Sequence, residues 1–361
     1  PAVRQRGSGA TEAALLEIWS AVLERPITSV DAGFFELGGH SFLAVQLIAR
    51  VEAAFGCRLP LASLFTGGTI AAQAALIDAQ ASGTGADEVL VTLRAAGERG
   101  TILLPHEISG HVLIYRPLAL RLAEGWRVVA LQARGLDNTR PPLDSLPAMA
   151  RAYADAVEAA GLPGPFVPVG FSYGAALAGE LSAELTARGH AVPFAVVIDA
   201  LPDPQAWVDG VVPEDEAGQL HYMVKAVEAS IGFDLGLDAS ILRQFGPETR
   251  IDLVHQRLTA VGAFGGSIGR DQVAGMLGVF RANLAALRGF QPARIPVPVH
   301  LWVTDALAAR PGRPGDLGWS GLTGHPVTVH RIGGDHLSLV KEPLAGELGD
   351  GISRLLAPLP S

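Results

Sequence analysis

The feature that most constrains the fold is a series of short apolar runs separated by helical segments after residue 100. The runs do not alternate apolar with polar residues, and helical segments such as 146–160 and 173–188 lie between them. Strands with this pattern are buried on both faces, which is typical of a mostly parallel sheet covered by helices. The sequence therefore predicts an α/β domain with strands at 101–104, 128–131, 166–169, 194–198, 297–303 and 327–332.

A helical insertion interrupts this series between about residues 203 and 290. Apolar residues repeat there at helical spacing in the segments 220–231, 254–261 and 273–287, and no strand is evident. An insertion placed just after a strand lies over the carboxyl ends of the strands, where α/β sheets bind ligands. We expect these helices to form a lid. The alternative is a helical subdomain with only a packing role.

The beginning of the chain predicts a small all-α bundle. Thr11 is expected to cap a first helix, whose apolar face runs through 14–23. A second helix begins at Ser41 and ends at Gly56, since glycine readily ends a helix. A short turn at 61–65 and a last helix at 70–77 complete the predicted bundle.

A short stretch of small and polar residues, 81–88, indicates a flexible linker. It divides the chain into a predicted domain at 1–80 and a predicted α/β domain at 89–361. The total length of 361 residues suits one large domain with a small companion.

Composition limits the partners and the compartment. The formal net charge of −9 argues against a nucleic-acid surface, and no apolar stretch approaches the roughly 20 residues that a bilayer span needs. The single Cys57, which we expect to be buried and inert, cannot form an internal disulfide, and this is consistent with a reducing cytoplasm. The chain begins at Pro1 without a signal-peptide pattern, so we expect a cytoplasmic piece excised from the C-terminal end of a longer protein.

A candidate nucleophile lies in the motif Gly170-Phe171-Ser172-Tyr173-Gly174, between a predicted strand and a predicted helix. A sharp turn in this context exposes the serine side chain at the carboxyl end of the strand, with a helix N-terminus beneath it. Glycines on both sides leave room for the turn. We therefore interpret Ser172 as a nucleophile, and the alternative is a surface serine in a tight turn.

A serine nucleophile needs a base, and the base needs an orienting acid. His336 follows the last predicted strand in the sequence Gly333-Gly334-Asp335-His336, where a loop can bring its imidazole to the serine. Asp199 and Asp305 each end a predicted strand between Ser172 and His336. Spacing alone does not choose between these two acids.

The negative charge that develops on an attacked carbonyl needs backbone N–H donors. We expect one from Tyr173, directly after the nucleophile, and one from Ile108, in the loop after the first predicted parallel strand. His106 and His111 belong to the same region, and we expect them to be solvated loop histidines.

Ser41 follows two glycines and a histidine at the start of a predicted helix. A phosphodiester on its hydroxyl would lie beside unpaired N–H groups and the positive end of the helix dipole. Capping of the helix by the same hydroxyl explains the residue equally well. The local physics leaves both interpretations open.

The neighbourhood of this serine, Asp31-x-x-Phe34-Phe35-x-Leu37-Gly38-Gly39-His40-Ser41, resembles the signature of a peptidyl carrier domain of a nonribosomal peptide synthetase. The rest of the chain resembles the type I thioesterase that ends such assembly lines, in the order oxyanion loop, Gly-x-Ser-x-Gly, strand ending in Asp, helical lid and Gly-Asp-His. The resemblance implies an α/β-hydrolase fold for this part. It implies 4′-phosphopantetheine bound covalently to Ser41, and it selects Asp199 over Asp305.

One segment departs from the family pattern: residues 105–110, Pro-His-Glu-Ile-Ser-Gly, replace the more usual His-Pro or Pro-Pro run before the glycine. The resemblance as a whole implies a terminal module that releases its peptidyl substrate through an acyl-Ser172 intermediate, by hydrolysis or macrocyclisation. It implies upstream condensation and adenylation domains and a phosphopantetheinyl transferase as partners, and no metal. The alternatives are a stand-alone serine esterase or lipase with a helical appendage, and a carrier and docking module without catalysis.

Overall fold

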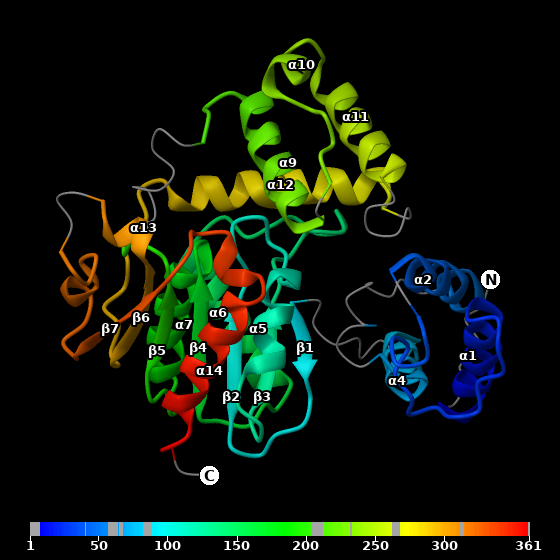
Figure 1. Cartoon of the computed structure of the whole chain (residues 1–361), viewed down its shortest axis with the longest axis horizontal. Helices are drawn as coiled ribbons and strands as arrows, with labels where there is room; N and C mark the ends of the chain where they lie inside the picture. Colours follow the sequence, from blue (N-terminus) through cyan, green and yellow to red (C-terminus); the bar gives the residue numbers. More distant parts are fainter. Residues whose placement is uncertain are drawn as a thin grey trace.

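A computed structural model of the chain describes residues 8–39, 41–56, 64, 68–81, 89–203, 212–231, 233–261, 268–310 and 314–359. Figure 1 shows a helical part at the beginning of the chain and a larger α/β part after it. None of the helices in these ranges combines the length and the apolar composition that crossing a membrane requires.

The helical part consists of α1 (Ser8–Val22), α2 (Ser41–Phe55) and α4 (Ile70–Ala81). Trp19 lies at the centre of its core, fully buried, with its ring edge-on to Phe34 at 5.2 Å between centroids. The indole Nε1 donates to Gln73 Oε1 at 2.9 Å, which satisfies the one polar atom of the ring. The predicted small helical bundle is confirmed.

The expected cap at Thr11 is wrong, because α1 begins three residues earlier, at Ser8. Thr11 is buried, and its hydroxyl donates to Asp78 Oδ1 of α4 at 2.6 Å. A buried hydroxyl needs a hydrogen-bond partner. Here α4, the last helix of the bundle in the chain, supplies it. Gly56 ends α2 with a φ of 65°, as expected. The linker predicted at 81–88 begins one residue too early, because Ala81 is the last residue of α4. Cys57 and residues 82–88 lie outside the described residues, as do 61–65 apart from Leu64.

The α/β part is built on a seven-stranded sheet in the order β1-β3-β2-β4-β5-β6-β7. The six strands from β2 to β7 are parallel to one another and correspond to the six predicted strands. Their bounds are β2 (Thr101–Pro105), β3 (Arg127–Leu131), β4 (Phe166–Phe171), β5 (Ala195–Ile198), β6 (Val299–Thr304) and β7 (Val327–Ile332).

The sequence analysis missed the edge strand β1 (Leu90–Arg94), which pairs with β3 in the antiparallel direction. All five of its residues are half-buried, so it lacks the continuous apolar character of the inner strands. Arg94 ends it with three guanidinium bonds, to the carbonyl oxygens of Leu122, Ala123 and Trp126. A charged residue at this position limits further pairing at the sheet edge.

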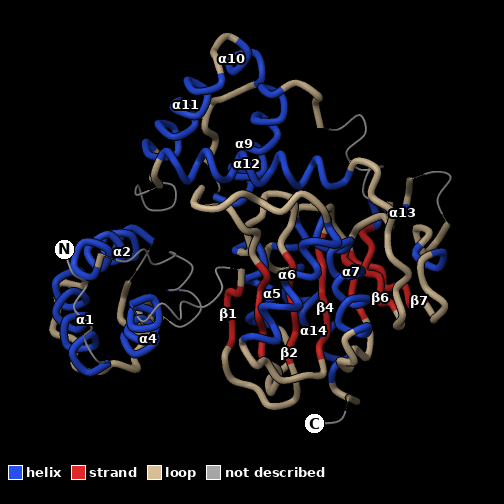
Figure 2. Tube along the Cα trace, turned by 180° about the vertical axis from the view of Figure 1, so that it is seen from behind, coloured by secondary structure: helices blue, strands red, loops and turns tan. Residues whose placement is uncertain are grey.

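Helices cover both faces of the sheet (Figures 1 and 2). Leu103 of β2 packs in the core shared with α6 (Leu146–Ala159) and α7 (Tyr173–Ala187). Its neighbours Ile102 and Leu104 pack on the opposite face, in the core shared with α5 (Arg116–Arg121) and α14 (Leu344–Leu356). Side chains of a strand alternate between faces, so burial on both sides explains why the sequence shows no alternation.

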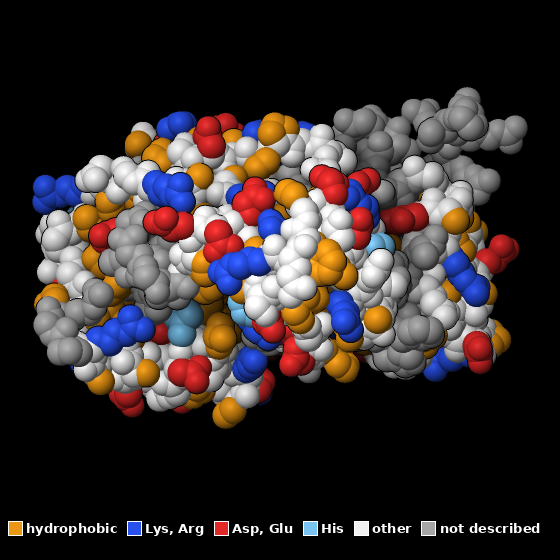
Figure 3. All heavy atoms as spheres, turned by 90° about the horizontal axis from the view of Figure 1, so that it is seen from above, with side chains coloured by type: hydrophobic (Ala, Val, Ile, Leu, Met, Phe, Trp, Pro, Cys, Tyr) orange, Lys and Arg blue, Asp and Glu red, His pale blue; other side chains and the backbone are white. Residues whose placement is uncertain are grey.

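The insertion between β5 and β6 contributes α9 (Glu216–Ile231), α10 (Ala239–Arg243), α11 (Pro247–Ala260) and α12 (Arg270–Leu287). As predicted, the described residues between 203 and 290 contain no strand. Figures 1 and 2 show these helices over the carboxyl ends of the parallel strands, with α12 lying across them. Acidic and basic side chains are mixed over the face seen in Figure 3. A short helix α13 (Asp305–Ala308) follows β6.

His300 of β6 provides a pH-sensitive contact in the sheet. Its ring lies between Phe194 and Trp302, and its Nδ1 lies 3.1 Å from His330 Nε2. Burial, and to a lesser extent the neighbouring His330, lower the pKa of His300 from 6.5 to about 4. As the pH falls below 6.5, the unfolded chain therefore binds the proton before the folded protein does, and stability is lost between pH 6.5 and 4.

We expect His300→Phe to reduce this loss, because phenylalanine keeps the ring contacts and does not titrate. The thermal midpoint of the α/β part should fall less between pH 7.5 and pH 4.5 in the variant than in the parent. Equal falls in the two proteins would show that His300 is not a source of the acid sensitivity.

Candidate active site

The turn between β4 and α7 holds Ser172 in an uncommon backbone conformation. Its φ is 56° and its ψ is −122°, and its N–H donates to the carbonyl of Ile198 at 3.2 Å. Non-glycine residues rarely adopt a positive φ, and such strain persists only where the surrounding structure imposes it. The backbone at Ser172 must therefore be held in this conformation by its surroundings, and the close contacts at Gly170 and Gly174 show how.

Both glycines of the motif are required by close backbone contacts. A Cβ atom on Gly170 would lie 2.0 Å from the carbonyl oxygen of Gly174. A Cβ atom on Gly174 would lie 2.5 Å from the carbonyl oxygen of Pro105, the last residue of β2. The spacing of the motif thus allows α7 to begin against the carboxyl end of the neighbouring strand.

Tyr115 holds the two strand ends together, a role that the sequence analysis missed. This residue is fully buried, and its hydroxyl donates to the carbonyl of Pro105 at 2.7 Å and accepts from the N–H of Phe171 at 3.0 Å. One hydroxyl therefore joins the ends of β2 and β4 directly before the serine.

His336 lies between Ser172 and Asp199. Its Nε2 lies 3.0 Å from Ser172 Oγ, and its Nδ1 lies 2.9 Å from Asp199 Oδ2. The loop after β7 supplies the histidine, and the ring of Phe171 stacks on the imidazole at 4.6 Å between centroids. The structure thus brings together three predicted site residues from three separate strand ends.

Asp199 is the carboxylate at this position, and Asp305 is not. Asp199 is only 1% exposed, and its Oδ1 accepts from the N–H and the Oγ1 of Thr304, both at 2.8 Å. Asp305 is an exposed residue at the start of α13. The sequence analysis did not predict the role of Thr304, because this role depends on the lateral pairing of β5 with β6.

The predicted oxyanion donors lie on two sides of the serine. Tyr173 is the first residue of α7, where backbone N–H groups have no acceptor within the helix. Ile108 lies in the loop after β2, and its carbonyl accepts from Asn283 Nδ2 at 2.9 Å. Neither the Tyr173 N–H nor the Ile108 N–H donates to a residue that the structure describes.

The expectation of solvated loop histidines is wrong. His106 is fully buried and stacks on Tyr173 at 5.7 Å between centroids, with Nδ1 2.7 Å from the carbonyl oxygen of Glu107. Burial lowers the pKa of His106 to about 4, so its imidazole is neutral at pH 7 and Nδ1 carries the donating proton. His111 is half-buried, and burial likewise lowers its pKa to about 4.

Glu107 makes hydrogen bonds within the loop after β2 that carries Ile108. Its carboxylate accepts from the N–H of Ser109 at 2.9 Å and from the Ser109 hydroxyl. Burial raises the pKa of Glu107, while the bonds from Ser109 and the nearby His336 act in the opposite direction. These contacts explain how a loop with an unusual sequence is held in one conformation.

The remaining described histidines have contacts away from Ser172. His190 pairs with Glu158 at 2.8 Å, and His221 and His255 bind carbonyl oxygens of the insertion. Within the described ranges, no group of three or more His, Cys, Asp or Glu residues is arranged to hold a metal ion.

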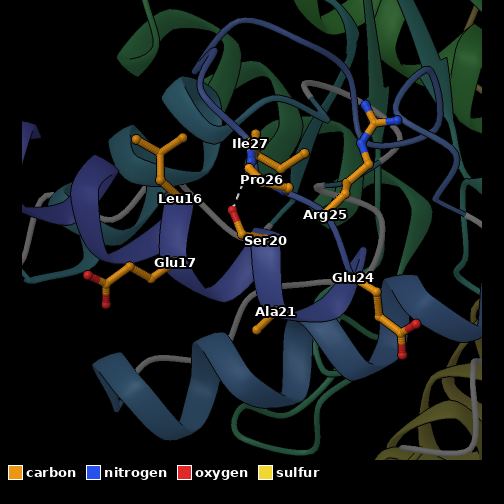
Figure 4. A pocket seen from close by; sticks show the side chains of 8 residues that line it. All are labelled: Leu16, Glu17, Ser20, Ala21, Glu24, Arg25, Pro26 and Ile27. Atoms are coloured by element: carbon orange, nitrogen blue, oxygen red, sulfur yellow. Dashed lines mark hydrogen bonds between the residues drawn. The ribbon is translucent and has the colours of Figure 1, made fainter.

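Ser41 is the first residue of α2, but the structure describes only its backbone and not its side chain. Gly39 belongs to a tight loop before it, because a Cβ atom there would lie 2.4 Å from the Phe34 ring. The attachment of a group to Ser41 therefore stays a prediction. A separate depression on this bundle, lined by Leu16, Ser20, Pro26 and Ile27 among others, contains none of the predicted site residues (Figure 4).

Comparison with protein families follows the same division of the chain. A model of the thioesterase domain matches residues 101–351, and a model of the phosphopantetheine attachment site matches residues 13–77. The chain belongs to the thioesterase domain family. Its α/β part is a hydrolase domain, and its helical part is a phosphopantetheine carrier, as the sequence resemblance predicted.

Curated relatives of this carrier and thioesterase pair are large synthetases. Chondramide synthase cmdD of Chondromyces crocatus is 28% identical over 92% of this chain and 9% of its own length. The dimodular nonribosomal peptide synthase of Bacillus subtilis (strain 168) is 31% identical over 53% of this chain and 8% of its own length. The chain thus spans less than a tenth of either relative.

Solved structures show the same fold. Holo-AB3403, a four-domain nonribosomal peptide synthetase bound to AMP and glycine, aligns with a TM-score of 0.67 and 24% identity over 100% of this chain and 27% of its own. The Vlm2 thioesterase domain aligns with a TM-score of 0.53 and 20% identity over 73% of this chain and 96% of its own. The predicted fold, a small helical carrier followed by an α/β-hydrolase domain with a helical lid, is confirmed.

We expect Asp199→Asn to lower kcat for a peptidyl thioester by about a hundredfold to ten-thousandfold, because the amide disfavours the imidazole tautomer that can accept a proton from Ser172. Steady-state hydrolysis of a soluble peptidyl thioester measures this loss. The matched control is Asp305→Asn, for which we expect a change within about twofold because the side chain is exposed. A larger loss in the control would assign the acid to Asp305.

Proposed function

We propose that this chain is the terminal carrier and thioesterase of a nonribosomal peptide synthetase and releases the peptide through an acyl-Ser172 intermediate. One observation carries the proposal: Ser172 Oγ, His336 and Asp199 form a continuous series of contacts at 3.0 Å and 2.9 Å under the lid. The family matches and the synthetase relatives support it.

Ser41 is the proposed attachment point of 4′-phosphopantetheine. The backbone fits this role, because α2 is a helix of 15 residues whose first N–H groups have no acceptor within the helix and favour a phosphodiester. When bound, the group supplies a thiol that holds the peptide as a thioester. The guanidinium of Arg116 on α5 lies 5.7 Å from the ring centroid of Phe35, a carrier residue in the motif that leads to Ser41.

Attachment in the same chain replaces a bimolecular encounter by an intramolecular one. The effective concentration of a tethered group reaches roughly the millimolar range for a short flexible linker. This high local concentration makes delivery to Ser172 efficient even where the free peptide thioester would bind weakly.

In the acylation step, Ser172 Oγ attacks the thioester carbonyl and gives its proton to His336 Nε2. Asp199 accepts from Nδ1–H and so stabilises the imidazolium. The Tyr173 and Ile108 N–H groups stabilise the negative oxygen of the tetrahedral intermediate. The carbon–sulfur bond then breaks, the leaving sulfur takes the proton from His336, and an ester to Ser172 remains.

In the release step, His336 accepts a proton from water or from an amine or hydroxyl of the peptide, which attacks the ester. Collapse of the second tetrahedral intermediate breaks the bond to Ser172 Oγ, and His336 returns the proton to the serine. The lid determines whether water reaches the ester, and hence whether the product is linear or macrocyclic.

The proposal includes upstream condensation and adenylation domains and a phosphopantetheinyl transferase that uses coenzyme A, all in the cytoplasm. A stand-alone esterase would have no use for the phosphopantetheine carrier matched at residues 13–77. A carrier without catalysis would not need Ser172 in a strained conformation with His336 in contact with both Ser172 and Asp199.

We expect treatment with coenzyme A and a phosphopantetheinyl transferase to add one phosphopantetheinyl group to the chain. The mass of the intact protein measures the addition. Ser41→Ala should keep the unmodified mass, because it lacks the hydroxyl that forms the phosphodiester. Modification of this variant would place the attachment at another residue.

When the carrier is loaded with a peptidyl group, we expect the parent chain to release it and Ser172→Ala to retain it as the thioester. Mass spectrometry distinguishes the retained thioester from linear and cyclic products. A fluorophosphonate should label the parent and not this variant. Release at the parent rate by Ser172→Ala would exclude the acyl-serine route.

A further inference from the structure

Asn283 connects the lid to both sides of the proposed oxyanion hole. This residue lies on α12 and is only 1% exposed. Its Nδ2 donates to the carbonyl of Ile108 at 2.9 Å, and its Oδ1 accepts from the Tyr173 hydroxyl at 3.4 Å. Its two partners are the residues whose backbone N–H groups are the proposed donors to the oxyanion.

Burial of the Asn283 amide costs folding free energy unless both its N–H and its oxygen are hydrogen-bonded. Both are bonded here, to Ile108 and to Tyr173. The helix around it approaches the core very closely. A Cβ atom on Gly110 would lie 2.5 Å from Val279 Cγ1, and one on Gly275 would lie 2.6 Å from the carbonyl of Leu136. Gly275, Val279 and Asn283 are four residues apart and therefore share one face of α12.

The bond from Asn283 completes the restraint of the peptide planes beside Ile108. The plane before Ile108 is held through the Glu107 carbonyl, which contacts His106 Nδ1 at 2.7 Å and accepts from the Gly110 N–H at 2.9 Å. In the plane after Ile108, the Ser109 N–H donates to Glu107 Oε2 at 2.9 Å, and the carbonyl accepts from Asn283. Of the bonds just named, only the one from Asn283 comes from outside the loop.

We propose that Asn283 is a positioning residue that fixes the oxyanion hole from the lid. It holds the Ile108 carbonyl and so restricts rotation at Ile108, which keeps this residue's own N–H, in the preceding peptide plane, in the direction needed for the transition state. The inference rests on the proposed acyl transfer at Ser172. In consequence, a displacement of α12 would move a group that holds the oxyanion hole.

Asn283→Leu tests the proposal, because leucine has a similar volume and neither donates nor accepts. We expect kcat for a soluble peptidyl thioester to fall by about tenfold to a hundredfold, with KM changed less than about threefold, since the donor acts mainly on the transition state. The matched control is His255→Leu, which removes a side-chain bond to the Ile268 carbonyl within the lid and not at the oxyanion loop. This control should keep kcat within about twofold of the parent.

Asn283→Asp supplies a second test that does not depend on the stability of the leucine variant. A protonated carboxyl group can donate to the Ile108 carbonyl, whereas a carboxylate cannot and repels it. The ratio of the variant kcat to the parent kcat should therefore fall as the pH rises. A ratio that does not depend on pH would contradict a hydrogen bond from this position to the Ile108 carbonyl.

The outcomes separate this inference from the proposed function. Loss of kcat in Asn283→Leu at unchanged KM, with a pH-dependent ratio in Asn283→Asp, supports the positioning role. Parent kcat in folded Asn283→Leu, or a pH-independent ratio in Asn283→Asp, overturns it while the release function stands. Absence of turnover by the parent itself would overturn the proposed function.

Discussion

The site depends on the contact between the carboxyl ends of β2 and β4. The backbone of Gly174 approaches the Pro105 carbonyl so closely that no side chain fits, and the Tyr115 hydroxyl bridges Pro105 to Phe171. This contact places the loop after β2 beside the strained turn at Ser172. The proposed oxyanion donors, Tyr173 and Ile108, lie in the segments that follow β4 and β2. They belong to one site because the ends of these two strands are in contact.

Burial controls the charge of the groups around this contact. His106 remains neutral because burial lowers its pKa to about 4, and the proton on Nδ1 then supports the oxyanion loop through the Glu107 carbonyl. Asp199 is buried as well, but Thr304 supplies two donors to one of its oxygens and leaves the other for His336. The hydrogen-bonded carboxyl group of Asp199 and the neutral imidazole of His106 therefore have distinct structural roles in one small region.

The helices of the insertion make two sets of contacts. Its outer helices α9, α10 and α11 pack with α12 around an apolar core that includes Leu220, Val254 and Phe280 and that extends to Ala133 and Leu136 outside the insertion. The inner helix α12 contacts the oxyanion loop through Val279 and Asn283. Because both sets of contacts involve α12, this helix links the outer helices of the lid to the loop that carries Ile108.

The sequence by itself determined the elements that depend on local pattern: the parallel strands, the helical insertion, and the motif that places Ser172 between β4 and α7. It also determined the carrier and thioesterase family, because both motifs are continuous in the chain. Strand spacing left Asp199 and Asp305 open as the acid, and only the family resemblance selected Asp199. The tertiary structure places Asp199 beside His336, because this contact depends on lateral strand order. The roles of Thr304, Tyr115 and Asn283 likewise became visible only in the tertiary structure, because each contacts a residue that lies far from it in the chain. For the same reason Thr11 is not the predicted helix cap: its hydroxyl bonds to the distant Asp78.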